Sequence, residues 1–172
     1  MDLSTIKRLN IKYVLNATAQ LENFHSSEPG ITYMKINVKD KTGVDLSEYF
    51  NQTTQFIHEG LSKGGVLVHC VAGASRSVTF VLCYLMSDVG ERLVLKDAYN
   101  WTKARRSIAR PNDSFLAQLA RHEIMLHDGL SSIAKTSEKI WNNYELNTLK
   151  RECVKGHLPS KLNISQNSCI IS

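Results

Sequence analysis

The sequence has few of the residues that mark fibrous or unstructured chains: its 172 residues include only 9 glycines and 3 prolines. This scarcity excludes a collagen-like or proline-rich chain. Hydrophobic residues make up 42% of the sequence and charged residues 22%, which is enough apolar material for a folded core. We therefore expect one ordinary globular domain with a shorter appendage.

Long hydrophobic runs are also lacking. The most apolar stretch, residues 78–86, is interrupted by Thr79 and Cys83 and falls well short of the ~20 residues that cross a bilayer. Residues 1–10 mix charged and polar side chains and do not contain the apolar segment of a secretory signal. We therefore expect the protein to be cytoplasmic, and a nuclear location is also compatible with the sequence. Both compartments are reducing, so the cysteines should be free thiols.

Neither the cysteines nor the charges indicate a metal or a nucleic acid. No pair of cysteines has the C-x-x-C spacing of a structural zinc site, so we expect neither a metal nor another cofactor. The net charge of +5 favours an anionic partner without distinguishing phosphate, nucleic acid and lipid headgroups. Because aromatic and basic residues do not alternate as they do in single-strand binding proteins, no nucleic acid is expected.

Hydrophobic spacing predicts strands that alternate with helices. Strands are predicted at residues 13–17, 31–37 and 66–68, and helices at 46–61, 78–86, 95–106 and 114–127. This order predicts a single α/β domain over residues 1–128, with a central, mainly parallel twisted sheet flanked by helices. Residues 129–172, where serine, asparagine and lysine become more frequent, are interpreted as a C-terminal tail.

The turn between the predicted strand 66–68 and the predicted helix 78–86 contains a cysteine and an arginine, Cys70 and Arg76. Backbone N–H groups in a strand–loop–helix turn can point inward and, with the positive end of the helix, bind a dianion such as phosphate. Gly73 allows the backbone to bend, and the planar Arg76 guanidinium fits two phosphate oxygens. Residues 70–76 are hereafter the phosphate loop. The loop residues expected to surround the substrate phosphate are Val71, Ala72, Gly73, Ala74, Ser75 and Arg76.

Cys70 is predicted to be a nucleophile. A helix N-terminus or a nearby cation can lower a cysteine pKa to roughly 3.5–7.5, which makes the thiol a thiolate near neutrality. Ser77 is placed to donate a hydrogen bond to the sulfur when it leaves a phosphocysteine, whereas His69 is interpreted as a residue that holds the loop. The alternative for Cys70 is an inert buried thiol like Cys83, but such a thiol needs neither the neighbouring glycine nor the arginine.

These residues match the signature H-C-x-x-G-x-x-R followed by serine or threonine, and the chain resembles the dual-specificity branch of the cysteine-dependent protein phosphatases. The likeness covers most of residues 1–128. Further matching segments lie at residues 13–18, 38–40, 45–50, 84–86 and 111–119. The resemblance implies phosphorylated proteins as substrates, and hydrolysis of phosphotyrosine and of phosphoserine or phosphothreonine through a phosphocysteine intermediate.

The resemblance also implies a general-acid aspartate on a loop upstream of the cysteine, where Asp40 lies. Protonation of a poor alkoxide or phenoxide leaving group is worth about 10²–10⁴ in rate. Asp45 is the competing candidate, but its position suits a helix cap. Asn112 lies in the Pro-Asn segment of the family, where the side chain is expected to brace neighbouring loops, including the phosphate loop.

Four basic residues precede this Pro-Asn segment: Lys103, Arg105, Arg106 and Arg110. They either hold a second phosphate or an acidic substrate segment, or simply favour the end of a helix. The sequence departs from the family at its start, because the strand that usually precedes the first helix is absent. We interpret this as a truncated chain or as a sheet without that edge.

RNA 5′-triphosphatases share this loop, but the aromatic and basic residues expected to bind a nucleic-acid strand do not alternate here. Two other functions are also compatible with the loop. A phosphoinositide phosphatase is one, but the variable loop positions lack the lysines expected to bind a polyphosphorylated inositol. A non-catalytic phosphoprotein-binding module is the other, but such modules usually lose the nucleophile, and Cys70 is present.

The last four residues, Cys169, Ile170, Ile171 and Ser172, have the C-a-a-X pattern of prenylation, and the final serine favours a farnesyl group. A single isoprenoid anchors weakly, and the tail has few basic residues to support it. The sequence therefore predicts reversible membrane association through a prenylated Cys169. The alternative is a chance cysteine at the end of a tail.

Overall fold

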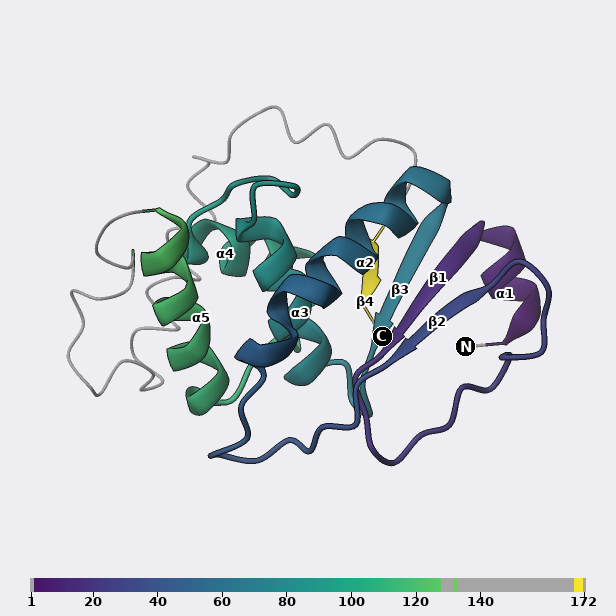
Figure 1. Ribbon diagram of the computed structural model, residues 1–172, viewed down its shortest axis with the longest axis horizontal. Coiled ribbons are helices and arrows are strands. Elements are labelled where there is room, and N and C mark those ends of the chain that lie inside the picture. Colours follow the sequence, from purple (N-terminus) through teal and green to yellow (C-terminus); the bar gives the residue numbers. More distant parts are fainter. Residues whose placement is uncertain (1, 128–131, 133–168, 172) are drawn as a thin grey trace.

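The centre of the fold is a parallel sheet, seen in a computed structural model that describes residues 2–127, 132 and 169–171 (Figure 1). Over these residues the sheet has four strands in the order β2–β1–β3–β4, and every neighbouring pair is parallel. The strands are β1 (Ile11–Asn16), β2 (Thr32–Lys35), β3 (Gly65–His69) and β4 (Cys169–Ile171). The predicted α/β fold with a parallel sheet is confirmed.

Helices connect and cover the strands. They are α1 (Leu3–Arg8), α2 (Phe50–Lys63), α3 (Arg76–Met86), α4 (Leu95–Arg105) and α5 (Asp113–Leu126), with a 3-10 turn η1 (Ser47–Tyr49) before α2. The α-helix predicted from residue 46 begins only at Phe50, because the chain first forms this tighter turn. Among the described residues, no helix combines the length and apolarity needed to span a membrane.

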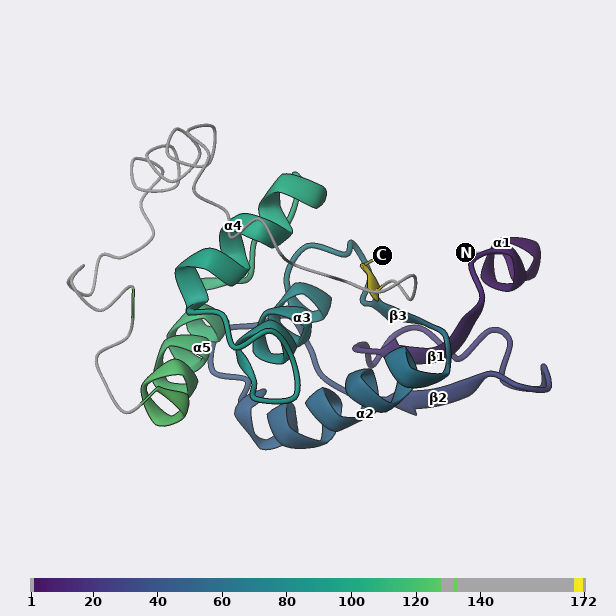
Figure 2. The same ribbon diagram turned by 90° about the horizontal axis from the view of Figure 1, so that it is seen from above.

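The sheet separates a small hydrophobic cluster from a large one. On one face, α1 packs through Ile6 against Ile11, Val14 and Leu67 of the strands. On the other face, α2 contacts β1 and β3, and α3 contacts β3 and β4. Figure 2 shows α1 and α2 on opposite sides of the sheet. Every residue of α3 is buried, so the helix is packed against other elements on all sides. The sequence predicted such a buried helix at residues 78–86.

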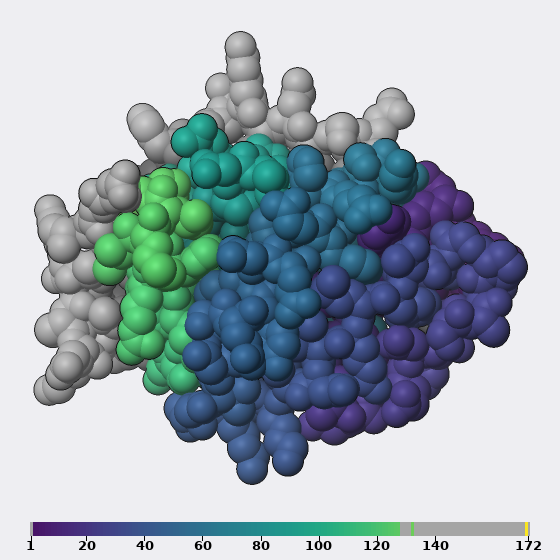
Figure 3. All heavy atoms as spheres, viewed as in Figure 1, coloured from purple at the N-terminus to yellow at the C-terminus, as the bar shows by residue number. Residues whose placement is uncertain are grey.

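Helix α2 lies close to the sheet at Gly60. A Cβ atom on Gly60 would lie 2.6 Å from Val66 Cγ2 and 2.7 Å from Tyr13 Cβ, so this approach requires a glycine. At its other end, α2 lies beside α5, where the rings of Phe50 and His122 meet with centroids 5.0 Å apart. In the space-filling view, the side chains of α2 and α5 fill the space between the two helices on this face (Figure 3). This packing fixes α3, and with it the phosphate loop, against the sheet.

Strand β4 was not predicted. It pairs in parallel with β3, in the register Val66↔Cys169, Leu67↔Ile170 and Val68↔Ile171. Most of the predicted tail, residues 129–172, lies outside the described residues, but its end joins the sheet. Three residues are too few to show the alternation of apolar and polar side chains that indicates a strand. The partner strand β3 is far away in the sequence, so no local pattern indicates the pairing.

Candidate active site

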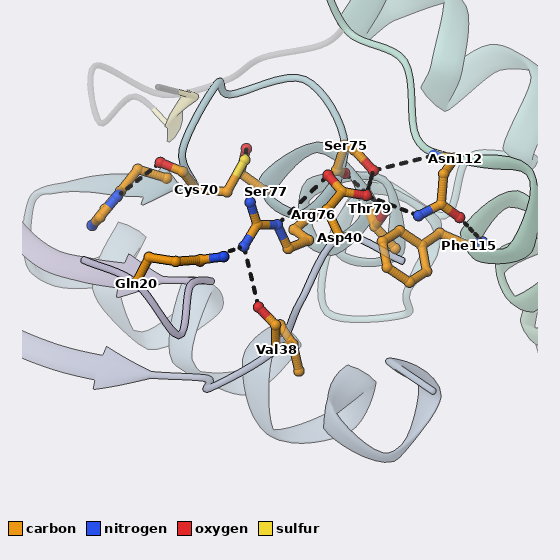
Figure 4. Close-up of polar contacts among 11 residues, drawn as sticks. Gln20, Val38, Asp40, Cys70, Ser75, Arg76, Ser77, Thr79, Asn112 and Phe115 are labelled. Carbon is orange, nitrogen blue, oxygen red and sulfur yellow. Dashed lines mark hydrogen bonds and ion pairs between the residues drawn. The ribbon is translucent and has the colours of Figure 1, made fainter. Parts of the chain in front are cut away.

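The predicted cysteine and arginine meet at the carboxyl edge of the sheet. His69 is the last residue of β3, Cys70 opens the phosphate loop, and Arg76 is the first residue of α3. Gly73 has φ +62°, a left-handed conformation that glycine adopts without strain. The loop thus turns directly from a buried strand into a buried helix, with the positive end of α3 beneath it (Figure 4).

The Cys70 thiol is buried, with 4% of the residue exposed, and its Sγ lies 3.3 Å from Ser77 Oγ. Burial alone would raise the pKa of Cys70. Hydrogen bonds from the Ser77 hydroxyl and from the N–H groups of Ser77, Gly73 and Ala74 outweigh it and lower the pKa below its ordinary value. The site therefore favours the thiolate, which is the nucleophilic form of cysteine.

Arg76 is equally buried and its guanidinium is held by three neighbours. Its Nη1 donates to Gln20 Oε1 at 3.2 Å and to the Val38 carbonyl at 3.1 Å. Its Nε lies 3.6 Å from Asp40 Oδ2 and makes no hydrogen bond (Figure 4). A buried donor without an acceptor is costly, and an anion in the loop would supply the acceptor. Arg76 is thus held by Gln20 and Val38, while its buried Nε has no hydrogen-bond acceptor.

Asp40 lies over the phosphate loop. Its Oδ1 accepts a hydrogen bond from Ser75 Oγ at 2.9 Å and another from Asn112 Nδ2 at 2.8 Å. Its side chain is 34% exposed, so the carboxyl group lies between the buried loop and solvent. The carboxyl group therefore contacts the loop while part of its surface remains open to solvent.

The competing aspartate, Asp45, lies elsewhere. Its Oδ1 accepts hydrogen bonds from the Ser47 hydroxyl at 2.6 Å and from the Ser47 backbone N–H at 2.8 Å. These two hydrogen bonds lower the pKa of Asp45. They also hold the carboxylate just before η1, but the N-cap of η1 is Leu46 and it has no side-chain cap, so the capping role expected for Asp45 is not observed. Asp40, and not Asp45, contacts the phosphate loop.

Asn112 and His69 contact the loop from outside. Asn112 donates its backbone N–H to Ser75 Oγ at 3.1 Å, and its Oδ1 accepts the N–H of Phe115 at 3.0 Å as the N-cap of α5. It thereby joins α5, the phosphate loop and Asp40. His69 Nδ1 lies 3.4 Å from the Cys70 carbonyl oxygen, and partial burial lowers the pKa of His69.

Sequence reasoning missed two contacts of the site. Gln20, which binds Arg76, was not considered, although it follows β1 and the carboxyl ends of parallel strands share one edge. Arg106 was expected to hold a second phosphate or an acidic substrate segment, or to favour a helix end. Instead, its Nη2 donates to the Ala72 carbonyl at 3.2 Å and its Nε to the Gly73 carbonyl. Arg105 instead lies over the Trp101 ring, with its guanidinium carbon 3.9 Å from the ring centroid.

Two other residues that the sequence predicted to have functional roles, Val71 and Cys169, take no part in the hydrogen bonds described above. Val71 is exposed at the start of the loop. Cys169 lies in β4 opposite Val66, in the sheet and not in the loop. Within the part of the chain that the structure describes, no three histidine, cysteine, aspartate or glutamate side chains converge as a metal site would.

Comparison with known proteins shows which family the chain is similar to. Residues 1–125 match the family model described as "Dual specificity phosphatase, catalytic domain". Human dual specificity protein phosphatase 9 is 41% identical over 123 residues, and human dual specificity protein phosphatase 7 is 39% identical over 160 residues. The matches cover 71% and 87% of this chain but 32% and 37% of those proteins. The chain therefore spans about a third of the length of these curated relatives.

A solved structure agrees with this match. The crystal structure of human DUSP28 superposes with a TM-score of 0.67 at 27% sequence identity, covering 73% of this chain and 85% of that one.

Proposed function

We propose, because this chain belongs to the dual specificity phosphatase catalytic-domain family, that it hydrolyses phosphotyrosine and phosphoserine or phosphothreonine in proteins. The observation that carries this proposal is the buried Arg76 guanidinium, whose Nε has no hydrogen-bond acceptor, in the same loop as a cysteine with a lowered pKa. A nucleophilic thiolate and a fixed cation with an available donor together suit attack on a bound phosphate ester.

In the first step, the Cys70 thiolate attacks phosphorus, and the bond between phosphorus and the leaving oxygen breaks. Asp40 gives its proton to that oxygen, which leaves as an alcohol or a phenol. The Arg76 guanidinium and the inward N–H groups of the phosphate loop stabilise the charge on the transferring phosphoryl oxygens. The product of this step is a phosphocysteine.

In the second step, water attacks the phosphocysteine. The Asp40 carboxylate, now deprotonated, takes a proton from the water, and the bond between phosphorus and sulfur breaks. Ser77 Oγ, 3.3 Å from Cys70 Sγ, donates a hydrogen bond to the sulfur as it leaves as a thiolate. Inorganic phosphate is released and the site returns to its starting state.

The test of the proposed function is a substrate panel. Phosphate release is measured from phosphotyrosine and phosphothreonine peptides, from short-chain phosphoinositides and from an RNA 5′-triphosphate. We expect hydrolysis of both peptides and much slower release from the other two. Faster hydrolysis of phosphoinositide or RNA would contradict the proposal. Binding of phosphopeptides with no release of phosphate would instead indicate a binding module.

Replacing the proposed general acid is expected to slow only those reactions whose leaving group needs a proton. Asp40→Asn should lower kcat by about 10²–10⁴ on an alkyl or phenyl phosphate. On an aryl phosphate with an acidic leaving group, the loss should be much smaller. Steady-state kinetics on both substrates measure this contrast.

The matched control is Asp45→Asn, which changes a nearby carboxylate that does not contact the phosphate loop. It should leave kcat close to the wild-type value on both substrates. Equal losses on both substrates for Asp40→Asn would mean that Asp40 positions the substrate or the loop and does not supply the proton.

We further propose that the protein is cytoplasmic, with a fraction held reversibly at membranes by a farnesyl group on Cys169. The support is the C-a-a-X pattern at residues 169–172. Residues 169–171 of this pattern form β4, whose backbone pairs with β3. A transferase must bind the C-a-a-X residues directly, so lipidation competes with strand pairing and should modify only part of the protein.

In a cell with farnesyltransferase, the wild-type chain is expected to divide between membrane and soluble fractions, whereas Cys169→Ser should be wholly soluble. One farnesyl chain contributes about 0.8 kcal/mol for each buried CH₂, which gives reversible attachment. Intact mass reports the adduct, and fractionation reports the location. Cys153→Ser, which leaves the terminal motif unchanged, is the control. An unmodified wild-type terminus would refute the lipid proposal.

A further inference from the structure

Consecutive carbonyl groups on the outer side of the phosphate loop are bound by a single segment, residues 106–110. Arg106 donates from Nη2 to the Ala72 carbonyl at 3.2 Å and from Nε to the Gly73 carbonyl. The next carbonyl, that of Ala74, accepts the backbone N–H of Arg110 at 2.7 Å. The segment that follows α4 therefore contacts the loop on the side away from the substrate.

These carbonyls share peptide planes with the N–H groups that face the substrate. In a planar trans peptide, the C=O of one residue and the N–H of the next point in opposite directions. The Ala72 carbonyl lies in one plane with the Gly73 N–H, and the Gly73 carbonyl lies in one plane with the Ala74 N–H. Both N–H groups lie close enough to Cys70 to lower its pKa. Arg106 thus binds the carbonyl side of the two peptide planes whose N–H groups face the Cys70 sulfur.

These two planes are also the ones that the backbone itself constrains least. They lie on either side of the Gly73 Cα, and glycine can rotate where other residues cannot. Gly73 has φ +62°. The loop therefore requires one backbone conformation at a residue that can adopt several. An external contact to both carbonyls removes that freedom, and a half-buried guanidinium with two parallel donors can reach both at once.

We propose that Arg106 is a positioning residue for the phosphoryl transfer: by binding the Ala72 and Gly73 carbonyls, it keeps the Gly73 and Ala74 N–H groups turned toward the Cys70 sulfur and the phosphate. This role rests on the proposed function, because a loop that bound no phosphate would need no such alignment. Arg106 does not touch the substrate and acts only through these two peptide planes.

The test uses Arg106→Met and Arg106→Lys, with Arg105→Met as the matched control. Arg105 is the adjacent arginine, it is exposed, and it contacts Trp101 and not the loop. Arg105→Met therefore removes the same charge from the same segment without altering the peptide planes. Arg106→Lys keeps the charge but replaces the two donor nitrogens of the planar guanidinium, each of which binds its own carbonyl, with a single ammonium nitrogen.

Two measurements report the loop without requiring a protein substrate. The rate of Cys70 alkylation by iodoacetamide as a function of pH reports the thiolate, and calorimetric titration with tungstate reports oxyanion binding. Both Arg106 variants should shift the midpoint of alkylation upward by about one pH unit and weaken tungstate binding about tenfold, as expected for losing hydrogen bonds to an anion. Arg105→Met should match the wild type.

Wild-type midpoints and tungstate affinities in Arg106→Lys, with a far-ultraviolet circular dichroism spectrum like that of the wild type, would overturn the inference. Equal shifts in Arg105→Met would also overturn it, because they would assign the effect to charge alone. If Arg106→Met does not fold, the Arg106→Lys result decides. Should the variants behave as expected while wild type hydrolyses no phosphopeptide, the positioning role stands and the proposed substrate class fails.

Discussion

Cys70→Ser is expected to lower kcat by at least about 10⁴-fold while the loop still binds oxyanions. A serine hydroxyl has nearly the shape of the thiol, but its pKa is far too high for the surrounding N–H groups and the Ser77 hydroxyl to ionise it. Without the thiolate no phosphocysteine forms. Phosphate release from a phosphotyrosine peptide measures the loss, and tungstate titration measures the binding that remains.

The chain offers a matched control in a second buried cysteine, Cys83. Cys83 lies in α3, where burial raises its pKa to about 12 although Thr54 hydrogen-bonds to it. Cys83→Ala should lower the melting temperature because it leaves a cavity in the core, and it should leave kcat nearly unchanged. Substantial hydrolysis by pure Cys70→Ser would reject the cysteine mechanism.

Arg76→Lys is the second large effect that we expect, with kcat lower by about 10³–10⁵, the value of an arginine that stabilises phosphoryl transfer. A lysine places one point charge where the guanidinium presents several donors in a plane. It cannot contact Gln20 Oε1 and the Val38 carbonyl while also binding two phosphate oxygens. The transition state would lose more than the ground state, so kcat should fall more than KM rises.

Steady-state kinetics and tungstate titration together measure this effect. Arg105→Lys makes the same substitution outside the phosphate loop and should be close to wild type in both. A kcat/KM value near that of the wild type in Arg76→Lys would remove Arg76 from the proposed role.

The catalytic loop was accessible to sequence reasoning because it is local. Cys70, Gly73 and Arg76 lie within one turn between a short strand that contains two valines and a mostly apolar helix, and each of these elements has its own sequence pattern. Asp40 was predicted through the family resemblance, and the sequence distinguished it from Asp45 only because Asp45 precedes a predicted helix. Their hydrogen bonds separate them in the structure: one carboxylate binds Ser75 and the other Ser47.

The parts that could not be predicted depend on contacts across long sequence separations. The bond from Arg76 to Gln20 spans 56 residues, and the bond from Arg106 to Gly73 spans 33. A polar side chain on a loop gives no indication of which distant carbonyl it will bind until the strands and helices are placed. Strand β4 is the extreme example, because its three residues form a strand only where β3 provides an edge.

The internal contacts of Arg76 also bear on product inhibition. The guanidinium donates to Gln20 and Val38 and lies near the Asp40 carboxylate. Inorganic phosphate must compete with that carboxylate for the same positive charge, which offsets part of its binding free energy. With the proposed function, we therefore expect inorganic phosphate to bind this loop more weakly, and to leave it more readily after each turnover, than it would a loop whose arginine had no nearby carboxylate.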